Sequence, residues 1–214
     1  MSHDMPGRRG RPRDATVDGR VLDAAWDLLH EAGYPGLTID EVAERAGAAK
    51  TTLYRRWPTK DHLAIALAAR ILGEVPIADT GDLRHDLTEF AAALAASLNR
   101  LRLAGHPDGG PSAGFAAELA AAAAHHADIG EVVRAGFAAR HELALARLRR
   151  ATERDGLRSD IDHAVLIDQV SGPIYYRVLI TGAPADRDYA ERLVSAVLEG
   201  TFGPAVDAAP QTLR

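Results

Sequence analysis

Two helices are predicted between Thr38 and Pro58, and each has room for only about two turns. Thr38 is a good helix N-cap residue, and Glu41 follows three places later, which is the spacing of a capping box. Gly47 is placed to end this helix, and a second helix can begin at Lys50. Pro58 ends the second helix because it disfavours the helical conformation of the residue before it. Two short helices around a tight, glycine-containing turn have the proportions of a helix-turn-helix.

The second short helix combines an apolar side with many hydrogen-bond donors. Leu53 and Trp57 are four residues apart, so they share a face of the helix and can pack inward. The polar side chains can then face outward and donate to base edges in the major groove of DNA. These side chains are Lys50, Thr51, Thr52, Tyr54, Arg55 and Arg56.

The remainder of the chain is also predicted to be helical. Aromatic residues make up only 5% of the chain, and its apolar content depends on Ala and Leu, which favour helix. Gly33 is expected to end the first helix in a left-handed conformation, and Gly172 and Pro173 are expected to bend a late helix. No segment alternates like a strand, so we expect an all-α fold. An Ala-rich helix is expected to break near His125, and a late helix is expected to begin at a cap on Asp160 or Asp162 and to run to residue 182. The other expected helices cover approximately residues 15–32, 38–46, 50–57, 60–73, 83–103, 129–154 and 186–198.

Composition divides the chain into three parts. Residues 1–14 are rich in Gly, Pro and Arg and are expected to form a flexible basic arm. A stretch rich in Pro, Gly and Asp reaches to about residue 81 and is expected to be a joint. It would separate a three-helix DNA-binding domain over residues 15–73 from a larger helical domain over residues 82–204.

Several classes of protein are excluded by what the sequence lacks. There is no cysteine, which excludes disulfides, thiolate metal sites and thiol redox sensing by this chain. No apolar run approaches the roughly 18 residues of a membrane span, and the first residues do not resemble a secretory signal. We therefore expect a cytoplasmic protein that does not contact a membrane.

Positive charge is concentrated at one end of an acidic chain. The net charge is −5, but the first 70 residues hold 11 Lys and Arg against 10 Asp and Glu, whereas the rest hold 14 against 20. Such a distribution of charge is expected when one end of a protein binds the phosphate backbone of DNA. The basic arm contains Arg11 and Arg13 around a proline, a slim segment suited to a narrow minor groove. The alternative is a disordered, solubilising tail.

The segment from Leu37 to Leu63 resembles the DNA-binding motif of the TetR family of bacterial transcription regulators. It reads LTIDEVAERAGAAKTTLYRRWPTKDHL. The family usually has Ser where this chain has Ala49, and Gly or Ala where it has Thr51, so one cap or phosphate contact is missing and a methyl group is added. The resemblance implies phosphate contacts from Thr38, Tyr54 and Lys60. It implies that the base-reading surface is formed by Lys50, Thr51, Thr52 and Arg55.

The resemblance also implies a role for the C-terminal helices. In the TetR family the last two helices of each subunit form the dimer interface, and the domain holds a small-molecule effector. Dimerisation is also favoured by geometry, because one short recognition helix reads too little sequence. Candidate pocket residues are Phe90, Leu94, Phe115, Leu119, Phe137, His141 and Tyr175, although ordinary core packing is the first interpretation of each. The adjacent pair His125 and His126 lacks the spacing of a metal site.

The expected function is that of a TetR-type regulator, a repressor that an effector releases from operator DNA. We expect no cofactor and no catalytic residues, since phosphate-binding loops, His-Glu-x-x-His and Gly-x-Ser-x-Gly motifs are absent. Three alternatives stay open at this point. They are a DNA-bound scaffold without an effector, an all-helical enzyme and a helical protein-interaction module.

Overall fold

The computed structural model describes most of the chain. The described residues are 15–73, 75, 78–104, 119, 122–154 and 160–202. Helices account for the regular structure among them, and no strand occurs in these ranges, which confirms the all-α fold. No helix in this part of the chain is both long and apolar enough to cross a membrane. The predicted basic arm, with Arg11 and Arg13, and the candidate pocket residue Phe115 lie outside the described residues.

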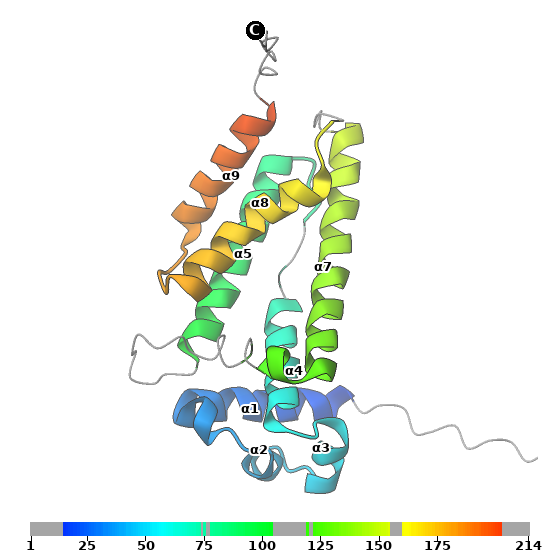
Figure 1. Cartoon of the computed structure of the whole chain (residues 1–214), viewed down its shortest axis with the longest axis vertical. Helices are drawn as coiled ribbons and strands as arrows, with labels where there is room; N and C mark the ends of the chain where they lie inside the picture. The colour runs from blue at the N-terminus through cyan, green and yellow to red at the C-terminus, as the bar shows by residue number, and fades with distance from the viewer. Residues whose placement is uncertain are drawn as a thin grey trace, which may run out of the picture.

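Four helices form one end of the molecule (Figure 1). They are α1 (Ala15–Gly36), α2 (Ile39–Arg45), α3 (Lys50–Arg56) and α4 (Lys60–Gly73). α1 packs against α2 and α4, and α2 packs against α3. Each helix contributes fully buried side chains to a common core, among them Leu29, Val42, Leu53 and Leu63. The two short helices are therefore held on a frame made by the two longer ones.

Local turn chemistry sets the length of α2. The Thr38 hydroxyl accepts a hydrogen bond from the Glu41 backbone N–H at 3.3 Å, as predicted for the N-cap. The Glu41 carboxylate does not complete the capping box, because it accepts a bond from Arg45 instead, at 3.0 Å. Gly47 has a φ of 60°, the left-handed conformation that turns the chain after α2.

α1 extends beyond its predicted end at residue 32. Gly33 has φ 66° and ψ −179°, a combination that is open essentially to glycine alone. This is a different region from the left-handed helical one that we predicted for a cap. The helix resumes for one more turn to Gly36, so the glycine produces a kink inside α1 and does not end it.

The rest of the described chain forms a larger helical body. Its elements are α5 (Leu83–Leu103), α7 (Ala127–Arg154), α8 (His163–Tyr175), the π-helix η1 (Tyr176–Ile180) and α9 (Arg187–Phe202). α5 packs against α8, η1 and α9, whereas α7 packs against α8 and α4. α7 thus runs along the molecule from α8 to the four-helix end (Figure 1). One cluster of buried apolar residues continues from α1 to α9, and the division into two domains stays a prediction.

The single helix predicted over residues 160–182 is divided into two elements. Asp162 caps α8 by accepting a hydrogen bond from the Ala164 N–H at 2.8 Å. Pro173 lies inside α8 and has no N–H to donate, so the regular bonding pattern cannot continue through it. The backbone then widens, and the Thr181 N–H donates to the Tyr176 carbonyl, five residues earlier, at 3.0 Å. A π-helical turn therefore follows the position where a bend was predicted, and the bend itself stays a prediction.

Candidate DNA-binding surface and internal pocket

α3 presents a polar surface to solvent and is anchored by its apolar side. Leu53 and Trp57 are buried, with exposed fractions of 1% and 8%, as predicted from their spacing. The predicted base-reading side chains all lie on the exposed surface of α3 or at its start. They are Lys50, Thr51, Thr52 and Arg55, and the predicted phosphate contact Tyr54 is exposed on the same helix. The sequence pattern therefore identified which side of the helix is free to meet another molecule.

Asp40 of α2 engages two of these side chains in the free protein. The Lys50 ammonium lies 2.9 Å from one carboxylate oxygen of Asp40, and the Tyr54 hydroxyl donates to the other at 3.2 Å. The hydrogen bond from Lys50 holds the pKa of Asp40 below its usual value, and the same bond raises the pKa of Lys50. The charge of Asp40 raises the pKa of Tyr54. Lys50 therefore stays cationic and Tyr54 neutral, but both would have to exchange Asp40 for a phosphate.

Other predicted DNA contacts differ in how free they are. Arg55 is exposed and forms no ion pair or hydrogen bond with any described residue. The Thr38 hydroxyl already accepts the helix-capping bond. The Lys60 ammonium donates to the Tyr34 backbone carbonyl at 3.3 Å and lies 4.4 Å from the centre of the Tyr34 ring. Lys60 is thus folded onto α1, and its predicted phosphate contact would require it to turn outward.

Arg56 is exposed, but its guanidinium is already engaged in the free protein. Its guanidinium pairs with Asp18 of α1 and lies 5.2 Å from the centre of the Trp57 ring. These contacts fasten the end of α3 to α1. In the free protein Arg56 is therefore held against α1 and is not simply a solvated charge.

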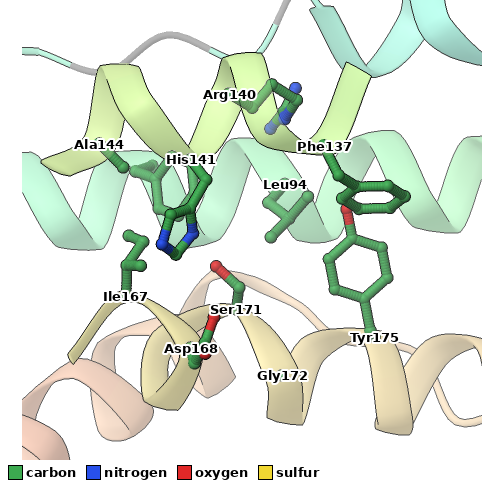
Figure 2. Close-up of a pocket in the computed structure, with 11 residues that line it drawn as sticks. Leu94, Phe137, Arg140, His141, Ala144, Ile167, Asp168, Ser171, Gly172 and Tyr175 are labelled. Carbon is green, nitrogen blue, oxygen red and sulfur yellow. The ribbon is translucent and has the colours of Figure 1, made fainter. Parts of the chain in front are cut away.

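A pocket of about 280 Å³ lies among α5, α7 and α8 (Figure 2). α5 provides Phe90 and Leu94 to its wall. The other walls come from residues at helical spacing on two facing helices. These residues are Phe137, Arg140, His141 and Ala144 of α7, and Ile167, Asp168, Ser171, Gly172 and Tyr175 of α8.

Five of the candidate pocket residues lie around this one space. They are Phe90, Leu94, Phe137, His141 and Tyr175. Leu119 instead packs against the apolar core beside α4 and α7 and does not line this pocket. Arg140 and Ser171 were not predicted from the sequence. Helical spacing could have indicated them, because Arg140 lies one turn from Phe137 on α7 and Ser171 lies one turn from Tyr175 on α8. Binding roles for all of these residues remain a prediction.

The pocket combines aromatic rings with a few polar groups. The rings of Phe137 and Tyr175 have centres 5.7 Å apart and are tilted by 57°. Figure 2 shows the Tyr175 hydroxyl pointing from α8 toward α7, and His141 pointing from α7 toward Ser171. Burial lowers the pKa of Arg140 and raises the pKa of Tyr175. Apolar walls with few polar groups are typical of small-molecule sites.

The helices that line the pocket also contact the four-helix end. The Arg100 guanidinium of α5 lies 5.2 Å from the centre of a Trp26 ring in α1. Asp128, near the start of α7, lies 2.8 Å from the Nε2 atom of His62 in α4. Two of the three helices that line the pocket, α5 and α7, therefore contact α1 and α4, which hold α2 and α3.

Charged side chains also connect α7 to the joint between the two parts of the molecule. Arg147 and Asp86 are both 2% exposed, and the Arg147 Nε donates to the Asp86 carboxylate at 3.0 Å. The same Nε donates to the Ala78 carbonyl at 3.0 Å and lies 3.3 Å from Asp79.

Among the described residues, no group of three or more His, Cys, Asp and Glu side chains is placed to hold a metal ion.

Comparison with known proteins gives consistent results along the chain. Residues 21–67 match the family model described as bacterial regulatory proteins, tetR family, and residues 77–197 match the tetracyclin repressor-like C-terminal domain. The chain is 32% identical to the uncharacterized HTH-type transcriptional regulator YdeS of Bacillus subtilis, over 92% of this chain and 95% of that protein. It is 31% identical to the DNA-binding transcriptional repressor TetR of Mycobacteroides abscessus, over 87% of this chain and 94% of that protein.

A solved structure gives the same result. The TetR family transcription regulator SCO0332 superposes with a TM-score of 0.67 at 35% identity, covering 86% of this chain and 97% of that one. The similarity therefore extends over both the four-helix end and the helical body that holds the pocket.

Proposed function

Because this chain belongs to the TetR family of transcription regulators, and is not an enzyme, we propose that it represses transcription and that an effector bound in the α5, α7 and α8 pocket releases it from operator DNA. Repression, as opposed to activation, is supported by the Mycobacteroides abscessus relative, which is named a repressor. The observation that carries the proposal is that α5 and α7 both line the pocket and contact the four-helix end.

The proposed DNA contact is made by α3 in the major groove. Arg55 is free to bond with base edges, whereas Lys50 and Tyr54 would move from Asp40 to phosphates. Arg11 and Arg13 would add contacts in the neighbouring minor groove. These assignments follow the family motif and the exposure of α3.

Dimerisation is proposed through α8, η1 and α9. TetR-family regulators bind operator DNA as dimers, and this face exposes apolar side chains that water would disfavour. Val165, Tyr176 and Ile180 are 51%, 61% and 74% exposed. A two-fold dimer would place two copies of α3 on half-sites about 34–36 Å apart, or a multiple of that distance.

Release would follow from a change in the spacing of the two recognition helices. A ligand between α5 and α7 favours whichever arrangement of these helices accommodates it. Arg100 and Asp128 then transmit that arrangement to α1 and α4. Operator DNA accepts only one spacing of the two α3 helices, so a ligand that favours another arrangement lowers affinity.

The test begins with selection of bound sequences from a random duplex pool, followed by affinity measurements on the selected operator. We expect Arg55→Ala to lower operator affinity roughly tenfold or more, because a base contact is lost. Arg149→Ala is a matched control, since Arg149 is exposed on α7, far along the chain from α3. The logarithm of affinity should also fall with the logarithm of salt concentration, by roughly 0.9 for each phosphate neutralised. If no duplex is bound at low salt, or if Arg55→Ala has no effect, the proposal is wrong.

A further inference from the structure

Arg140 is a cation in the pocket wall without a counter-ion among the described residues. Three other arginines of α7 have a carboxylate partner: Arg147 pairs with Asp86, and Arg150 and Arg154 pair with Asp79. Arg140 forms no such pair, although it is half-buried. Asp168 also lines the pocket, but it is exposed and does not bond to Arg140.

An unpaired guanidinium among apolar walls is energetically costly. Burial removes water from the charge, and that loss is offset only by hydrogen bonds or by an opposite charge. The lowered pKa of Arg140 has the same cause, since burial disfavours its charged form. Burial raises the pKa of Tyr175, so its hydroxyl stays protonated and remains a donor. The pocket therefore offers a cation and a neutral O–H donor, and an anion is the complement of both.

The rest of the pocket is suited to a flat, apolar group. The Phe137 and Tyr175 rings stand beside the space, with centres 5.7 Å apart. Leu94 and Ile167 are buried side chains that add apolar surface. Aromatic rings favour offset or edge contacts with another ring, and the volume of about 280 Å³ is close to the lower end for ligand pockets.

We propose that the effector is a small organic anion, a carboxylate on a flat apolar body, whose charged group pairs with Arg140 and accepts a hydrogen bond from Tyr175. This inference rests on the proposed function, because it assigns a chemical class to the effector of the same pocket. The Phe137 and Tyr175 rings hold the flat body. The carboxylate occupies the position of the missing counter-ion, so neutral analogues of the same shape bind less tightly.

The test compares charged and neutral probes of matched shape on the full-length protein. Benzoate and naphthoate are titrated by calorimetry beside benzamide and naphthamide, in the absence of DNA. At least one carboxylate should bind roughly tenfold or more tightly than its amide, as charge-assisted bonds predict. Arg140→Gln should remove that preference while leaving amide binding nearly unchanged. Arg140→Lys should restore part of it, and the exposed control Arg149→Gln should retain all of it.

The outcomes separate this inference from the proposed function. Equal binding of acid and amide by the unmodified protein, an undiminished preference in Arg140→Gln, or no carboxylate binding at roughly 1 mM would overturn the anion assignment. The same probes are then added to the complex with operator DNA. A carboxylate that binds through Arg140 but leaves the DNA complex intact supports the ligand class and contradicts effector-driven release. If the amide releases the protein from DNA as readily as the acid does, effector-driven release is supported and the anion assignment is contradicted.

Discussion

At the scale of single residues, the DNA-binding surface of the free protein is partly occupied by its own carboxylate. Asp40 holds both Lys50 and Tyr54, while Arg55 is unpaired within the described residues. All of these side chains are exposed, and ion pairs in water contribute little to stability. The arrangement therefore affects binding more than folding, because DNA must compete with Asp40 for Lys50 and also approach a negative charge.

Asp40→Asn should consequently bind DNA more tightly. The amide oxygen can still accept the Tyr54 hydrogen bond, but Lys50 is released and one negative charge is removed. Affinity for non-operator duplex should rise roughly two- to fivefold, on the scale of an exposed ion pair. The salt dependence should steepen by up to roughly 0.9 for one additional neutralised phosphate. Fluorescence anisotropy over a salt series measures both. Weaker binding by Asp40→Asn would instead show that Asp40 positions Lys50 for its phosphate.

At the scale of elements, the chain uses a buried ion pair to join α5, α7 and the joint before α5. The Asp86 carboxylate accepts bonds from Arg147 and from the Thr80 N–H and hydroxyl. Burial opposes the charge of Asp86, yet these bonds outweigh it and hold the pKa of Asp86 below its usual 3.8. A buried pair of this kind specifies one arrangement of helices. Removing Arg147 leaves the buried charge of Asp86 uncompensated, and removing Asp86 leaves Arg147 with only the partly exposed Asp79.

This pair predicts a particular dependence of stability on pH. The pKa of Asp86 is lower in the folded state, so the unfolded state binds more protons near pH 3.8 and stability rises with pH there. The contribution of Asp86 should be complete above about pH 5 and be lost as pH falls below 3.8. Thermal unfolding followed by circular dichroism between about pH 7 and about pH 3 measures it.

Two variants identify the source of that dependence. Asp86→Asn should lower stability at neutral pH by up to about 3–5 kcal/mol and should show a smaller loss in acid. Asp188→Asn removes an exposed carboxylate that pairs with Arg192 within α9, and its stability should stay close to that of the unmodified protein. If both variants follow the same curve, the buried pair is not the source of the acid sensitivity.

At the scale of the whole molecule, one helical chain connects a DNA-binding surface, a ligand pocket and an uncovered apolar face. α5 and α7 extend toward the four-helix end (Figure 1). α8 lines the pocket, and α8 and η1 also carry exposed apolar residues. α8 is therefore placed to respond both to a ligand and to a second subunit. The π-helical turn after Pro173 lies in this same region.

The uncovered face should be needed for dimerisation. Ile180→Glu places a charge at a position that is 74% exposed in the single chain, so the subunit should fold normally while the dimer dissociates. Light scattering should show the mass of one subunit, and operator affinity should fall because the two half-sites are no longer bound together. Leu143→Glu, at another exposed apolar position on α7, should remain dimeric. A dimeric Ile180→Glu protein would place the interface elsewhere.

Much of the fold could be predicted because its signals act over a few residues. Thr38 and Glu41 are three apart, Leu53 and Trp57 are four apart, and α5 begins and ends where it was predicted to. The apolar side of α3 and its exposed polar surface followed from helical spacing alone. At Gly33 the predicted position of the irregularity was right and its geometry was not. The π-helical turn after Pro173 was not predicted, because its geometry depends on more than the neighbouring residues.

The sequence alone determined the helical class, the two short helices and the outward surface of α3, because propensity, caps and periodicity are properties of neighbouring residues. Only the tertiary structure showed that Asp40 occupies that surface, that Arg147 meets Asp86 across 61 positions, and that Arg140 has no counter-ion in its pocket. The physical reason is that charge pairing and burial depend on distance in space. Helix packing brings distant residues together, and no local pattern specifies which charges will meet.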